Sequence, residues 1–134
     1  MSRKLILKII DWCENRYGLS KFQPTFFKLR VYKHKKIHAD GETQFGSYCE
    51  NKNLMTIYLG SITSVELLIQ IVIHEYTHYL QPIKTCYKDL WDHYGGYKKH
   101  PLEIEAWEVA YRDYRICLET LEKSLGIKLR QKQI

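Results

Sequence analysis

The segment that most constrains the fold of this chain is an apolar stretch that leads into two histidines. Residues 67–73 read Leu-Leu-Ile-Gln-Ile-Val-Ile, and His74 and His78 follow them directly, before Pro82 interrupts the pattern. A helix that is apolar on nearly every side has to be covered by other elements of the fold. The pattern therefore predicts a buried helix that ends before Pro82 and lies beneath a cleft.

The two histidines enclose a glutamate in the pattern H-E-x-x-H, written here as His74-Glu75-Tyr76-Thr77-His78. Helical residues four positions apart lie one above the other on the same face, so both imidazoles can reach one metal ion. Glu75 points to one side of them, where it can take a proton from a metal-bound water. Two imidazoles and a carboxylate suit zinc, which lowers the pKa of a bound water. The motif predicts two metal ligands and a general base, and the alternative is a pair of structural histidines.

The candidates for a third protein ligand are His93, His100, Glu103 and Glu105. On the helix that Pro101 is expected to open, Glu103 shares a stripe with Ala106 and Ala110. Small side chains on that stripe would let this helix approach the histidine helix closely. Glu105 points to nearly the opposite side, among charged residues, which is typical of a solvated face. We therefore expect Glu103 to be the third ligand.

The segment before this helix is rich in rings that can donate hydrogen bonds. Residues 83–100 are expected to form a long loop, a kind of segment that often carries function. Candidates for contacts with the substrate or the transition state are His93, Tyr94, Tyr97 and His100. The alternative is that these rings only attach the loop to the core.

The chain as a whole is expected to form one α+β domain, residues 1–134, with the element order α-β-β-β-α-α. A small, mostly antiparallel three-stranded sheet would pack on the histidine helix. The elements are expected at residues 3–17, 25–34, 44–50, 54–59, 63–81 and 101–125. Thr63 with Glu66 three residues later has the spacing of a helix capping box. Gly18 and Gly126 stand where the first and the last helix should end.

The combination of H-E-x-x-H with Pro101-Leu102-Glu103-Ile104-Glu105-Ala106, or P-x-E-x-E-A, resembles the gluzincin metallopeptidases. It is similar in particular to their minimal members, the minigluzincins, and to the ImmA/IrrE-like metallopeptidases. The resemblance implies a zincin-like domain with Zn²⁺ held by His74, His78 and Glu103, and hydrolysis of peptide or protein substrates. It also implies that an edge strand, here within residues 44–50, lies along the substrate.

Two further points come from the same resemblance. Many gluzincins have Asp or Asn four residues after the ligand glutamate, whereas this chain has Trp107, so the partner that orients the imidazoles is not identified. Minimal gluzincins can be kept inactive by a terminal segment in the cleft. The basic tail, residues 127–134, is expected to be flexible or to lie in the cleft in this way.

The charge balance keeps other functions open. The chain has 21 Lys+Arg against 15 Asp+Glu, a formal net charge of +6, and basic clusters occur at residues 33–36 and 128–132. Such clusters favour nucleic acid as a partner without identifying it. One alternative is therefore an SprT-like protease that acts on DNA-associated proteins, with His93 or His100 as the third ligand. Another is a regulatory zincin-fold protein that binds a partner with little turnover.

The apolar runs and the N-terminal segment of the chain bear on the cellular location of the protein. The apolar runs are only a few residues long, so no membrane span is expected. The N-terminal apolar run is interrupted by Lys8 and followed by Asp11, which is too polar for a secretory signal. We therefore expect an intracellular protein.

Overall fold

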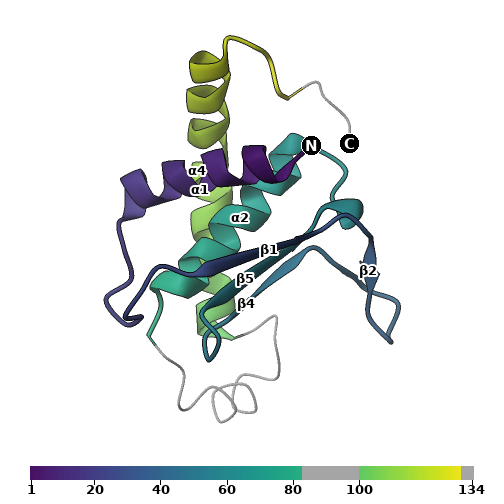
Figure 1. The fold of residues 1–134 in the computed structure, drawn as a ribbon, viewed down its shortest axis with the longest axis vertical. Coiled ribbons are helices and arrows are strands. Elements are labelled where there is room, and N and C mark those ends of the chain that lie inside the picture. Colours follow the sequence, from purple (N-terminus) through teal and green to yellow (C-terminus); the bar gives the residue numbers. More distant parts are fainter. Residues whose placement is uncertain (83–99, 131–134) are drawn as a thin grey trace.

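The helix that contains the two histidines, α2 (Val65–Leu80), lies at the centre of the fold (Figure 1). The computed structural model describes residues 1–82 and 100–130. One side of α2 packs against the sheet, and α1 (Arg3–Tyr17) and α4 (Pro101–Leu125) pack against the helix as well. Nearly all of α2 is buried, which agrees with its apolar sequence. This burial fixes the backbone that carries the motif.

The three helices begin and end close to the expected residues. α1 ends at Gly18 with φ of 81°, and α4 ends at Gly126 with φ of 69°, conformations that glycine adopts without strain. The expected N-cap of α2 was wrong by one position. Ser64, rather than Thr63, accepts a hydrogen bond from the backbone N–H of Leu67 at 3.1 Å. Both hydroxyls can cap a helix, so the sequence did not separate them.

The main sheet has three strands in the order β1-β5-β4, and they are β1 (Lys28–Tyr32), β5 (Leu54–Tyr58) and β4 (Gly46–Cys49). β1 runs parallel to β5, and β4 runs antiparallel to it. A separate antiparallel pair consists of β2 (Lys36–Ile37) and β3 (Thr43–Gln44), and a short helix, η1 (Leu59–Ser61), leads from β5 to α2. The α+β class and the element order are confirmed, and two of the three strand pairings are antiparallel.

The strand expected at residues 44–50 is divided between the two sheets. The backbone N–H of Tyr58 donates to the carbonyl of Phe45 at 2.9 Å, at the point where the chain leaves β3 and enters β4. A Cβ at Gly46 would lie 2.8 Å from the carbonyl oxygen of Thr56. A larger side chain at this position would therefore push β4 away from β5, and the glycine permits the change of sheet.

A buried carboxylate joins α1 to α4. Asp113 is 1% exposed; it accepts a hydrogen bond from the Tyr17 hydroxyl at 2.7 Å and two from the Arg112 guanidinium at 2.9 and 2.8 Å. The bonds from Arg112, together with that from Tyr17, outweigh the effect of burial and hold the pKa of Asp113 below its ordinary value. This joint holds α1 and α4 together.

The described part of the tail lies at the C-terminal end of α4. Leu129 is buried, and its backbone N–H donates to the Glu122 carboxylate at 2.7 Å, while Arg130 donates to the same carboxylate. Residues 127–130 of the tail, which was expected to be flexible or to lie in the cleft, do not line the cleft, and residues 131–134 lie outside the described part of the chain. None of the helices in residues 1–82 and 100–130 has the length and apolarity that a membrane span requires.

Candidate metal centre

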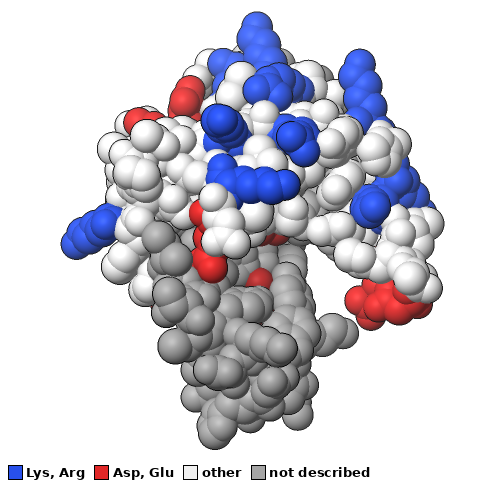
Figure 2. Space-filling view, turned by 60° about the horizontal axis from the view of Figure 1, so that its bottom comes forward, with Lys and Arg blue, Asp and Glu red and all other residues white. Residues whose placement is uncertain are grey.

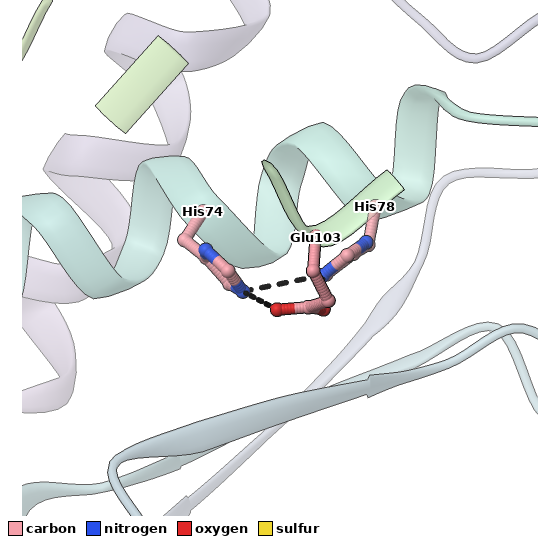
Figure 3. Close-up of side chains that lie close together, drawn as sticks. All are labelled: His74, His78 and Glu103. Atoms are coloured by element: carbon pink, nitrogen blue, oxygen red, sulfur yellow. Dashed lines mark hydrogen bonds and ion pairs between the residues drawn. The ribbon is translucent and has the colours of Figure 1, made fainter. Parts of the chain in front are cut away.

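The two motif histidines direct the same ring atom to the same point in space (Figure 3). His74 and His78 lie one turn apart on α2, are 1% and 6% exposed, and have their Nε2 atoms 3.2 Å apart. Two imidazole lone pairs at this distance repel each other unless a proton or a cation lies between them. The helix thus presents two nitrogen donors in a form that suits a metal ion.

Glu103 reaches the same point from the first turn of α4. Its Oε2 lies 3.2 Å from the Nε2 of His74, and its Oε1 contacts the Nε2 of His78. The three ligand atoms all lie within 4.8 Å of one another. Ala106 and Ala110 are fully buried, which agrees with the expected stripe of small residues where α4 lies against α2. The three side chains expected to bind the metal are therefore brought together.

The carboxylate of this cluster is held in its charged form. Burial by itself would raise the pKa of Glu103, but its interactions with the imidazoles of His74 and His78 outweigh burial, and the net shift is far below the ordinary value. An ionised carboxylate that is only 3% exposed is costly unless positive charge compensates it. The cluster of His74, His78 and Glu103 could therefore hold a metal ion.

The orientation of His78 is fixed by a residue that the sequence analysis did not single out. The Nδ1 of His78 lies 2.7 Å from the Oε1 of Gln81. The Nε2 of Gln81 donates to the carbonyl of Leu102 at 2.9 Å and to the Oε1 of Glu105 at 2.8 Å. Because both of those partners accept, the amide must present its oxygen to His78, so the Nδ1 of His78 carries the proton. The Nε2 of His78 is then left with a lone pair for a metal.

This network also changes the interpretation of Glu105. Its side chain is exposed, as its charged stripe predicts, but it also holds the amide that orients His78. Gln81 stands three residues after His78, a spacing at which two side chains on a helix are neighbours. That spacing is the only feature of the sequence that could have pointed to Gln81. It is a weak signal, because the amide is oriented only when α4 supplies its two acceptors.

Trp107 occupies the position at which the resemblance led us to look for Asp or Asn. Its ring packs on the imidazole of His74, with centroids 4.1 Å apart and an angle of 46° between the planes. The Nδ1 of His74 has no hydrogen-bond partner among residues 1–82 and 100–130. The two imidazoles are therefore held differently, that of His78 by a hydrogen bond and that of His74 by contact with an aromatic ring.

The cluster opens into a cleft of about 1140 Å³. One wall contains β3, the turn that precedes it and β4, and the other contains the motif residues and Trp107. Glu75 lines the cleft and is 5% exposed. The carboxylates in the lining are Asp40, Glu42, Glu50, Glu75 and Glu103. No Lys or Arg occurs among the described residues that line it.

Among the described candidates, His100 does not join this cluster. His100 is fully buried and caps α4, where its Nδ1 accepts a hydrogen bond from the backbone N–H of Leu102 at 3.2 Å. It does not line the cleft and is not among the three grouped side chains. His93, Tyr94 and Tyr97 lie outside the described residues.

Comparisons with protein-family models, with curated proteins and with solved structures found no match to this chain.

Proposed function

We propose that the chain is a zinc-dependent metallopeptidase of the gluzincin type, with His74, His78 and Glu103 as zinc ligands and Glu75 as general base. The observation that carries this proposal is the convergence of two imidazoles from α2 and one carboxylate from α4 in a single buried cluster. That cluster opens into a cleft that Glu75 also lines.

The donor set favours zinc among the common biological metals. Two imidazole nitrogens and one carboxylate are a known ligand set of catalytic zinc, whereas magnesium and calcium prefer oxygen donors throughout. Three protein ligands leave a coordination position open for water or substrate. Bound zinc would supply a Lewis acid that acidifies water and polarises the scissile carbonyl.

Glu75 is the residue that transfers the proton from the attacking water to the leaving amine in this proposal. It follows His74 directly on α2 and reaches the same cleft. In the proposed reaction its carboxylate takes a proton from the attacking water as the oxygen adds to the carbonyl carbon, and it then delivers that proton to the leaving amine nitrogen. The C–N bond breaks as that nitrogen is protonated, so one water is consumed for each peptide bond.

The shape of the cleft favours a peptide over a small molecule. Gly46, Ser47 and Tyr48 of β4 line it, and β4 is an edge strand in the described sheet. An extended peptide can add to such an edge through main-chain hydrogen bonds, with its scissile bond near the cluster.

The experiment that tests the proposal combines metal analysis with a hydrolysis assay. The full chain and the Glu75→Gln variant would be analysed for bound metal and incubated with a mixed library of internally quenched peptides. We expect about one zinc per chain in both proteins, because Glu75 is not a ligand. We expect hydrolysis only in the unmodified chain, because removal of a general base lowers the rate by roughly 10²–10⁴.

Glu108→Gln is the matched control, since Glu108 is exposed on α4 and does not line the cleft. This variant should retain both zinc and activity. Hydrolysis that survives in Glu75→Gln would refute the assigned role of Glu75. Zinc without hydrolysis in the unmodified chain would favour a partner-binding protein instead, and absence of metal would make the histidines structural.

A further inference from the structure

A second surface of the molecule lies on the face of the sheet opposite α2. Along β1, Leu29 and Val31 pack against the core, whereas Lys28 and Arg30 are exposed. None of the three strands β1, β4 and β5 contains an acidic residue. On this outer face Tyr32 and Tyr58 are also partly exposed, whereas Thr56 between the strands is buried.

Three aromatic rings form a cluster at the end of this face. In the parallel register of β1 and β5, Tyr32 lies beside Tyr58. Their rings are stacked with centroids 5.4 Å apart and an interplanar angle of 14°. The ring of His34 lies 5.0 Å from that of Tyr32 and 5.7 Å from that of Tyr58. Both tyrosines are only partly buried and His34 is exposed, so the cluster offers ring surface to a ligand.

The basic turn beside the rings is held in a fixed position. A Cβ at Gly60 would lie within 2.4–2.6 Å of backbone atoms of residues 33–35, so only glycine allows this approach. The backbone N–H of Lys36 also donates to the hydroxyl of the buried Ser61 at 2.9 Å. Lys33 and Lys35 therefore project from a backbone that is anchored to η1. A cationic surface that is ordered in advance loses less entropy when it binds a ligand.

We propose that this surface, the basic–aromatic face, binds single-stranded nucleic acid. Its residues are Lys28, Arg30, Tyr32, Lys33, His34, Lys35, Lys36 and Tyr58. Figure 2 shows Lys and Arg side chains at several places on the described surface in that view, and Asp and Glu at fewer. Proteins that bind single strands combine positive charge along the backbone with aromatic rings on which bases stack. The basic–aromatic face has both features, on β1 and β5 and on the turn that follows β1.

This partner fits better than other anionic ones. In a duplex the base faces are already stacked, so the rings of Tyr32 and Tyr58 would find no partner there. An anionic membrane would be matched by the charges, but its headgroups offer no flat bases for the rings of Tyr32 and Tyr58 to stack on. Single-stranded DNA and RNA share the required chemistry and are distinguished by the test.

The test measures fluorescence anisotropy of labelled 20-nucleotide oligo-dT and oligo-U with the full chain, in EDTA so that the metal centre does not contribute. We expect binding that weakens roughly tenfold or more between 50 and 200 mM salt, as counterion release requires. Lys33→Glu with Lys35→Glu should abolish most of it. Tyr32→Ala should weaken it at least about fivefold and Tyr32→Phe should not, since stacking needs the ring and not the hydroxyl.

The control is Lys4→Glu with Lys123→Glu, which makes the same change in net charge at exposed positions of α1 and α4. This control should retain binding. An equal loss in the control would mean that net charge alone attracts the strand and would overturn the proposal. No binding at 50 mM salt, tighter binding to a duplex of equal length, or binding only to phosphatidylserine vesicles would also overturn it.

Discussion

The cleft and the basic–aromatic face involve the same small sheet but carry opposite charge. The cleft has five carboxylates in its described lining and no Lys or Arg. The outer face has basic side chains from β1 and the following turn, and its strands contain no acidic residue. Figure 2 shows acidic side chains within the hollow and basic ones above it. The formal net charge of +6 is a sum over the whole chain and describes neither region.

The two regions also differ in burial, which sets how strongly their charges act. The three grouped ligand side chains of the cleft are at most 6% exposed, so their interactions are little screened by salt. The lysines of the outer face are exposed, and charges in water contribute little to folding. Substitutions in the cluster should therefore have large effects on metal binding, whereas substitutions on the face should act on a charged partner alone.

The largest effect is expected from Glu103→Ala. Loss of one of three ligands should weaken zinc binding more than the roughly 10–100-fold that removal of a supporting partner costs. The affinity would be measured by competition with a chelating dye. Glu105→Ala, two residues along the same helix, is the matched control and should stay within about threefold, because Leu102 still accepts from Gln81. Equal losses in the two variants would contradict the assigned ligand.

Asp113 tests whether such effects are local, because it belongs to neither region. Asp113→Asn removes a buried charge that accepts from Tyr17 and Arg112, and we expect it to lower the free energy of unfolding by roughly 2–3 kcal/mol at pH 7. Zinc affinity per folded chain should not change. Urea denaturation would measure the first quantity and dye competition the second, with Asp11→Asn on the exposed face of α1 as control.

Asp113→Asn should also change how the free energy of unfolding depends on pH. Because the folded pKa of Asp113 lies below its unfolded value, its contribution to stability is present above the unfolded pKa and is lost as pH falls through the folded pKa. Asp113→Asn should therefore lose less stability than the unmodified chain when the pH is lowered from 5 to 2. A parallel loss in the two proteins would show that other groups control unfolding in acid.

A smaller effect is expected from Gln81→Leu, which removes the acceptor for the Nδ1–H of His78. We expect zinc affinity to fall by roughly tenfold, because His78 then loses the contact that sets its tautomer and ring orientation. Gln81→Glu keeps an acceptor at this position and should recover most of the affinity. If both variants bind zinc as the unmodified chain does, the network is not what orients the histidine.

The sequence predicted the parts of the fold that depend on local pattern. The helices at residues 3–17 and 101–125 were expected at the bounds that the structure has, because stripes of apolar residues and the glycines that follow them are read within one segment. The grouping of Glu103 with the histidines was also expected, since Ala106 and Ala110 mark the side of α4 that approaches another helix.

The parts that were missed depend on contacts between distant segments. Gln81 gains its role only because α4 places the carbonyl of Leu102 and the carboxylate of Glu105 beside it. The break between β3 and β4 depends on the approach of Gly46 to Thr56 across the sheet. Likewise, the alignment of Tyr32 with Tyr58 follows from the parallel register of β1 and β5, which no local pattern specifies.

The smallest effect on folding and metal binding is expected on the basic–aromatic face. Lys33→Gln with Lys35→Gln removes two exposed charges that take part in no described ion pair within 4 Å in residues 1–82 and 100–130. The free energy of unfolding should change by less than about 0.5 kcal/mol, and zinc affinity should stay the same. Urea denaturation at 50 and 500 mM salt would measure the first, because any residual charge effect should disappear at the higher salt. A loss above about 1 kcal/mol would mean that the turn supports the fold, and the contrast between a buried cluster and a solvated face would then fail.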